Sequence, residues 1–182
     1  TFLKDIKKCE AGHAMLIKNN KIYKKWRYYD IPYEGKYTKD SELEIINHTK
    51  TLLNNSIKRQ LVSDVPVGAF LSGGVDSSTI VAIASKYNKN PINCFTINLI
   101  NKDSNEGFED DFPYAKKVAS YLNVPLHNIS VKAETLYTYI EKMIYHLDEP
   151  QADPAPINAY LISELAKKHN IKVLLSGAGG DD

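Results

Sequence analysis

A run of serines, glycines and one aspartate near the middle of the chain has the residue types that bind a phosphate. Residues 72–78 read SGGVDSS and lie between an apolar run and a predicted helix. Paired glycines let the backbone turn tightly with its N–H groups pointing one way, and the start of the helix adds N–H groups and its positive dipole end. Serine hydroxyls are further donors. The segment therefore predicts an anion-binding loop.

Asp76 does not suit a bare anion site, because a carboxylate repels phosphate. It suits a site in which a divalent cation lies between the carboxylate and the phosphates, since Mg²⁺ prefers oxygen ligands. The loop lacks the lysine of a Walker loop and the spacing of the GxGxxG dinucleotide fingerprint. A capped strand–turn–helix corner is the simpler interpretation. The position of the loop after a strand of a predicted parallel sheet favours a binding site instead.

Strands and helices alternate along most of the chain. Short apolar runs predict strands at 65–71, 92–97, 126–131 and 173–175. Capping signals and apolar spacing predict helices from Ser41, over 75–87, from Pro113, over 136–147 and from Pro156. This alternation is typical of an α/β fold with a doubly wound parallel sheet, in which ligands bind beyond the carboxyl ends of the strands.

A β-hairpin is predicted near the N-terminus. The segments AMLI at 14–17 and KIY at 21–23 flank Asn19 and Asn20, and asparagine tolerates the positive φ angles of a tight hairpin turn. A linker is predicted over 28–37, where proline and glycine interrupt the pattern.

The composition is that of an ordinary globular protein. Hydrophobic residues make up 43% of the 182 residues, and the net charge of +1 predicts neither nucleic acid nor an anionic membrane as a partner. Cys9 and Cys94 form no disulfide framework, and no leader is evident, so a cytoplasmic location is expected. No apolar run approaches the roughly 20 residues that a membrane span needs.

Residues 72–78 resemble the pyrophosphate loop of the N-type ATP pyrophosphatases, the PP-loop superfamily. Further segments are similar to glutamine-hydrolysing asparagine synthetases, and the resemblance covers about residues 62–182. These segments are VPVGAFL at 65–71, FTI at 95–97, DD…YA at 110–115, DEP…DPAPI at 148–157 and LLSGAGGD at 174–181. The resemblance implies the adenine nucleotide alpha hydrolase-like fold, truncated, with the hairpin before it.

The same resemblance implies a site for ATP and Mg²⁺. The residues implied to bind the nucleotide are Leu71, Ser72, Gly73, Gly74, Asp76, Ser77, Ile97, Ser176 and Gly177. Among them, Ile97 would contact adenine largely through its backbone. Asp76 and Asp181 are the implied Mg²⁺ ligands, and no catalytic residue is assigned.

The implied reaction is adenylation of the aspartate side chain by ATP, followed by amination with ammonia from glutamine, which yields asparagine, AMP and pyrophosphate. Two alternatives stay open: a ligase acting on another carboxylate, as β-lactam synthetase does, and a nucleotide-binding module without catalysis. Ala178 keeps the first of these open, because the family usually has glutamate at that position. Asp182 likewise replaces a usual glutamate.

Two domains are expected. Residues 1–37 resemble the last strands of a glutaminase domain plus a linker, and 38–182 resemble an incomplete ATP-pyrophosphatase domain. Cys9 is not assigned as the glutaminase nucleophile, which stands at the mature N-terminus in the family, where this chain has Thr1. The chain is therefore expected to be a piece of a longer protein that makes no asparagine by itself. An open sheet edge is expected to favour a homodimer.

Overall fold

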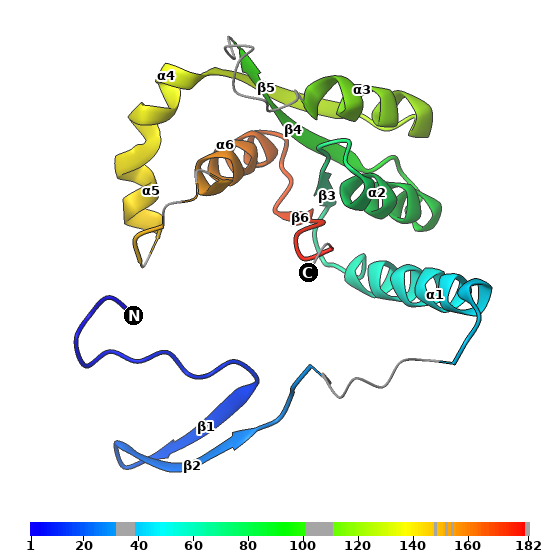
Figure 1. Cartoon of the computed structure of the whole chain (residues 1–182). Helices are drawn as coiled ribbons and strands as arrows, with labels where there is room; N and C mark the ends of the chain where they lie inside the picture. Colours follow the sequence, from blue (N-terminus) through cyan, green and yellow to red (C-terminus); the bar gives the residue numbers. More distant parts are fainter. Residues whose placement is uncertain (32–38, 101–110, 148, 152, 154, 181–182) are drawn as a thin grey trace. The chain divides into compact units, whose positions relative to one another are not determined.

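Figure 1 shows a computed structural model of the chain, which describes residues 1–31, 39–100, 111–147, 149–151, 153 and 155–180. The chain divides into two units, Thr1–Glu42 and Leu43–Asp182. The first unit holds an antiparallel hairpin, and the second holds a parallel sheet with helices on its faces.

The hairpin consists of β1 (His13–Lys18) and β2 (Lys21–Arg27). Asn19 and Asn20 join the strands with φ angles of 51° and 57°. Positive φ at both positions is what a two-residue type I′ turn requires, so the predicted hairpin is confirmed. Most of the linker predicted after it lies outside the described residues.

Four parallel strands in the order β5-β4-β3-β6 form the sheet of the second unit. They are β3 (Val67–Phe70), β4 (Asn93–Ile100), β5 (Leu126–Lys132) and β6 (Val173–Leu175). The predicted α/β fold is confirmed, but two strand ends differ from the prediction by two residues or more. β3 begins at Val67 rather than Val65. β4 continues past Ile97 to Ile100, because β5 pairs with it as far as Lys132.

The long helices follow the predicted segments. They are α1 (Glu42–Gln60), α2 (Val75–Tyr87), α3 (Asp111–Leu122) and α6 (Ala155–Lys168). Pro113 and Pro156 lie in the first turns of α3 and α6, where the missing N–H of proline costs no helical hydrogen bond. None of the described helices combines the length and the apolar character needed to cross a bilayer.

The single helix predicted over 136–147 is wrong. The segment is divided into α4 (Ala133–Leu136), a 3₁₀ turn η1 (Tyr137–Tyr139) and α5 (Ile140–His146). Tyr139, with φ −97° and ψ −7°, marks the break before α5. Two tyrosines and a threonine fill the 3₁₀ turn, and aromatic and β-branched side chains lose rotamer freedom in a regular helix.

The two faces of the sheet carry different helices (Figure 1). Cys94 packs with Ile57 of α1 and Val81 of α2 in one apolar cluster, whereas its neighbour Phe95 packs with Ile162 of α6 in another. The chain thus leaves β3 through α2 on one face and enters β6 from α6 on the other. Since β3 and β6 are paired neighbours, the sheet has its topological switch point between them.

His127 has a structural position in β5. Its Nε2 lies 2.9 Å from Asn93 Oδ1, and its ring centroid lies 5.1 Å from that of Phe95 and 3.8 Å from that of His169. Burial lowers the pKa of His127 below its usual value of about 6.5, and the charge of a protonated His169 lowers it further. The folded protein therefore resists protonation of this imidazole.

We expect the free energy of unfolding to fall as the pH drops below about 6.5, because the unfolded chain then binds more protons at position 127 than the folded chain does. The comparison is urea unfolding at pH 7.5 and pH 5.5. The His127→Gln variant should lose less stability between the two pH values than the unmodified chain. The His48→Gln variant changes an exposed position of α1, and its loss of stability should equal that of the unmodified chain. An unchanged pH response in His127→Gln would contradict this account.

Candidate nucleotide site

The two glycine loops meet at the switch point. The phosphate loop (residues 72–78) follows β3, the second glycine loop (residues 176–180) follows β6, and the two strands pair in parallel from Val67↔Val173 to Ala69↔Leu175. A Cβ at Gly177 would lie 3.0 Å from Asp76 Cβ, and one at Gly180 would lie 2.6 Å from Asp76 Oδ2. The second loop therefore packs its backbone directly against Asp76.

Serine hydroxyls tie the phosphate loop together. Ser72 Oγ lies 3.0 Å from Ser77 Oγ, and it accepts a 3.3 Å hydrogen bond from the Gly74 N–H. Ser77 Oγ accepts from the Ser72 N–H and donates to the Gly74 carbonyl, each at 3.3 Å. These bonds hold the turn closed in front of α2, so the loop is pre-formed.

The start of α2 faces the same space. Gly74 stands at the N-cap with φ −66° and ψ 165°, and no side chain caps the helix there. The N–H groups of the first turn thus remain directed at the loop, together with the positive end of the helix dipole. Such an arrangement stabilises an anion, and phosphate is the common case.

Asp76 lies in the first turn of α2 with its carboxylate beside the second glycine loop. Among the described residues, no group of three or more His, Cys, Asp or Glu side chains could hold a metal ion by itself. A single carboxylate suits Mg²⁺, which usually takes one or two carboxylates and completes its octahedron with phosphate oxygens and water. Asp76 would hold such an ion. Asp181, the second predicted ligand, lies outside the described residues.

A cleft of about 760 Å³ opens at the switch point and is called the nucleotide cleft below. β3 and the phosphate loop line one part of it, the second glycine loop another, and the start of α6 the rest. The lining residues are Phe70, Ser72, Gly74, Val75, Asp76, Ser77, Ala155, Asn158, Ala159, Ile162, Ser176, Gly177 and Ala178. Helices α2 and α6, on opposite faces of the sheet, thus both begin at this one cavity.

Most of the residues predicted to bind the nucleotide line this cleft, and three do not. Leu71 is buried at 1% exposure, and its N–H donates to the Phe95 carbonyl at 2.9 Å. Gly73 packs against the start of α3. Ile97 lies inside β4, where it pairs with Ile129 and packs with the apolar cluster on the α6 face. The contact of Ile97 with adenine stays a prediction.

Asn158 was not identified from the sequence, although it lines the cleft. It belongs to a stripe on α6 at positions 155, 158, 159 and 162, the i, i+3, i+4, i+7 spacing of one helix face. The stripe was visible as a pattern, but only the sheet order shows that it faces the cleft.

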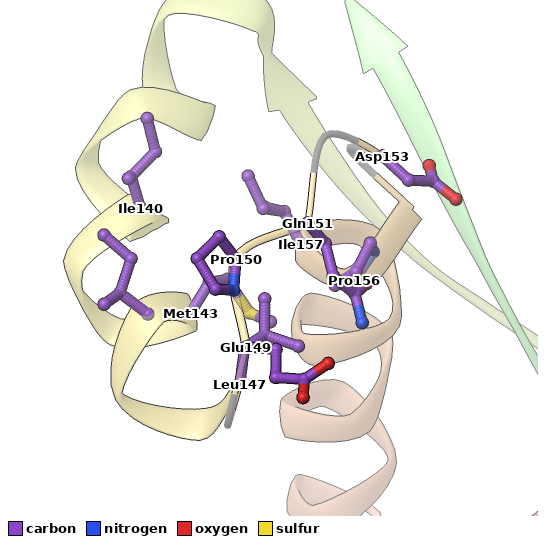
Figure 2. A pocket seen from close by; sticks show the side chains of 10 residues that line it. Ile140, Met143, Leu147, Glu149, Pro150, Gln151, Asp153, Pro156 and Ile157 are labelled. Carbon is purple, nitrogen blue, oxygen red and sulfur yellow. The ribbon is translucent and has the colours of Figure 1, made fainter. Parts of the chain in front are cut away.

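A second, apolar pocket of about 600 Å³ lies between α5 and the start of α6 (Figure 2). Its apolar walls include Met143, Leu147 and Ile157, and none of its lining residues belongs to a strand or to either glycine loop. Asp153, at its edge, accepts a 2.8 Å hydrogen bond from the Ala155 N–H and thereby caps α6. The pocket lacks an anion-binding loop, so the switch-point cleft is the candidate nucleotide site.

An α/β sheet with this pair of loops at its switch point defines a class of protein, those with the adenine nucleotide alpha hydrolase-like fold. Among solved structures, the U34-tRNA thiolase NcsA from Methanococcus maripaludis is similar, with a TM-score of 0.53 over 78% of this chain and 48% of that one. The sequence identity is 17%, so this likeness concerns the fold alone.

Residues 48–182 match the asparagine synthase family, and the chain belongs to that family. Similar proteins include a putative glutamine-hydrolysing asparagine synthetase 2 of Methanocaldococcus jannaschii, 36% identical over 87% of this chain, and asparagine synthetase 1 of Bacillus subtilis, 30% identical over 97%. The amidase chyE of Penicillium rubens is 28% identical over the whole chain. The chain spans 29%, 27% and 29% of the lengths of these three relatives.

Gly73 and Gly74 should respond differently to the same substitution. Gly73 has φ 90°, and a Cβ there would lie 2.4 Å from the backbone nitrogen of Ala115, whereas a Cβ on Gly74 would meet only Ser72 Oγ at 3.4 Å. We expect Gly73→Ala to lower the free energy of unfolding by at least about 2 kcal/mol and Gly74→Ala by less than about 1 kcal/mol. Urea unfolding of the two variants measures this, and equal losses would show that α3 does not brace the loop.

Proposed function

We propose that this chain is the nucleotide-binding part of a ligase that uses ATP to convert aspartate to asparagine, with glutamine or ammonia as the nitrogen source. The observation that carries the proposal is the nucleotide cleft, where the phosphate loop, the start of α2 and the second glycine loop meet. Membership in the asparagine synthase family supports the class of reaction. The particular substrate rests on the names of the relatives.

The reaction proceeds in two steps. An oxygen of the aspartate side-chain carboxylate attacks the α-phosphorus of ATP, and the bond from that phosphorus to the bridging oxygen breaks, which releases pyrophosphate and leaves an acyl-adenylate. Ammonia then attacks the acyl carbon, loses a proton, and expels AMP to leave the amide. Each step is a group transfer, so the protein contributes mainly by positioning the reactants and stabilising charge.

The residues of the cleft have distinct parts in this proposal. The N–H groups at the start of α2 bind the β- and γ-phosphates, and the hydroxyls of Ser72 and Ser77 keep the loop in the shape that presents these N–H groups. Asp76 would hold Mg²⁺. When bound, Mg²⁺ offsets the negative charge that builds on the departing pyrophosphate.

A ligase for a different carboxylate is the second candidate, and Ala178 favours it. Ala178 lines the nucleotide cleft, where a carboxylate that the family usually supplies is replaced by a methyl group. The relatives include proteins named amidases as well as asparagine synthetases. A nucleotide-binding module without catalysis is the third candidate.

An assay on the full-length protein separates the three candidates. It supplies ATP, Mg²⁺, ammonia and one carboxylic acid at a time and measures amide, AMP and pyrophosphate. Asparagine formed with an equal amount of AMP supports the proposal. Amide from another acid, with none from aspartate, supports the second candidate, and ATP binding without product from any acid supports the third.

Asp76→Asn should weaken ATP binding through the metal. The neutral amide is a weaker Mg²⁺ ligand than the carboxylate, so we expect the dissociation constant for ATP to rise roughly tenfold or more in Mg²⁺ and to change little in EDTA. Isothermal titration calorimetry in both buffers measures the effect. Asp64→Asn, an exposed carboxylate before β3, is the matched control and should bind like the unmodified chain. An equal loss in Mg²⁺ and EDTA would indicate that Asp76 acts only through its packing against the second glycine loop.

A further inference from the structure

The strand β5 forms one edge of the parallel sheet (Figure 1). In the part of the chain that the structure describes, its one strand partner is β4, and the register between the two runs without a shift from Cys94↔Leu126 to Ile100↔Lys132. Natural proteins usually protect such an edge with a proline, a bulge or a very short strand. β5 has 7 residues, none of them proline, and it carries no bulge, so it presents a regular template for a further strand.

Alternate residues of β5 direct their backbone groups to the open edge. The Pro125 carbonyl, just before the strand, accepts a 2.9 Å hydrogen bond from the Cys94 N–H. Successive residues of a strand point their N–H and C=O groups to opposite edges. The backbone groups of Leu126, Asn128 and Ser130 therefore point away from β4, where an added strand could pair with them.

A groove of about 410 Å³ lies between α3 and β5. Leu126 and Asn128 line it from the strand, and Phe112, Lys116 and Ala119 line it from the helix. None of the described residues that line it belongs to β4, so the groove lies over the edge strand itself. Side chains alternate between the two faces of a strand, so every second side chain of a strand added to β5 would lie on the face that carries this groove.

Lys116 is the one charged side chain among the described residues that line the groove. Its ammonium group favours a carboxylate on an incoming strand, because the other lining side chains offer no competing charge. An open strand with a groove beside it is the arrangement in which an extended peptide adds to a sheet. In such complexes the main-chain hydrogen bonds give affinity, and the pockets for alternate side chains give specificity.

A second copy of this chain suits the edge less well than an acidic peptide does. The side chains of β5 that share the face of the groove are Leu126, Asn128, Ser130 and Lys132. None of them is acidic. Antiparallel pairing of β5 with the β5 of a second copy would bring a second Lys132 to an edge that already carries Lys116, and like charges on paired strands repel.

We propose that β5 is a docking edge for an extended peptide segment of another protein, which adds to the sheet as a further strand and places an acidic side chain beside Lys116. The main chain of the peptide pairs with the outward groups of Leu126, Asn128 and Ser130. The inference is independent of the proposed function, because the groove and the nucleotide cleft share no lining residue.

The first test measures the binding of two capped, dye-labelled peptides by fluorescence anisotropy at low salt. Both are as long as β5 and alternate threonine with valine, except that the central residue is glutamate in one and lysine in the other. We expect the glutamate peptide to bind with a dissociation constant below about 1 mM and roughly fivefold more tightly than the lysine peptide. The Lys116→Glu variant should prefer the lysine peptide instead, because the charge in the groove is reversed.

Lys117→Glu is the matched control for this charge reversal. Lys117 lies on the same helix with its ammonium group 5.4 Å from the centroid of the Tyr114 ring, and it does not line the groove. The variant should therefore keep the preference of the unmodified chain. Equal affinities of the two peptides for the unmodified chain, or a preference that Lys116→Glu leaves unchanged, would overturn the inference.

Asn128→Pro tests the backbone pairing separately from the charge. Proline is tolerated on an edge strand where the N–H faces solvent, so urea unfolding should show an intact fold. The variant lacks an outward N–H, and its ring obstructs an added strand, so we expect both peptides to bind roughly tenfold more weakly or worse. In the unmodified chain, the glutamate peptide should slow hydrogen exchange at the Ser130 N–H.

Sedimentation analysis distinguishes a peptide from a second copy as the occupant of the edge. We expect the unmodified chain and Asn128→Pro to have the same oligomeric state. A dimer of the unmodified chain that Asn128→Pro dissociates would overturn the inference, because a second copy would then occupy the edge. Unchanged exchange at the Ser130 N–H in the presence of bound glutamate peptide would also overturn it, since the peptide would then bind elsewhere.

Discussion

The pairing of β3 with β6 is the constraint on which the site depends. The phosphate loop and the second glycine loop lie far apart in sequence, and each alone is a turn of backbone. Parallel pairing from Val67↔Val173 to Ala69↔Leu175 fixes both turns at the same edge of the sheet. The contact is close enough that a side chain at Gly177 or Gly180 would collide with Asp76. The geometry around this carboxylate is therefore set by strand register rather than by either loop.

The crossing of the chain from one face of the sheet to the other gives the cleft its two kinds of wall. α2 presents the positive end of its dipole from one face, and α6 presents a stripe of small and apolar residues from the other. A sheet wound on one face only would place both helices on the same side and leave no space between their ends. The placement of the anion site and of the α6 wall at one cavity thus follows from the strand order β5-β4-β3-β6.

Local chemistry made some features predictable, and tertiary pairing decided the others. The hairpin turn followed from Asn19 and Asn20, and the phosphate loop followed from its glycines and its place after an apolar run. The break at Tyr139 was missed although two tyrosines and a threonine fill the 3₁₀ turn, and the extension of β4 to Ile100 was missed because it depends on pairing with β5. Asn158 was missed because a helix face has no direction until the sheet order is known.

Because β6 follows the other strands of the sheet in the sequence, the chain can complete the nucleotide cleft only after those strands have been synthesised. Ribosomes release β3, α2, β4 and β5 before α6 and β6, so a nascent chain holds the phosphate loop well before it holds the opposite wall. Until β6 pairs with β3, the second glycine loop does not cover Asp76. A triphosphate would then contact only the phosphate loop. Under the proposed function, tight ATP binding therefore requires β6 to be in register with β3, and ATP would favour the paired state of these two strands by mass action.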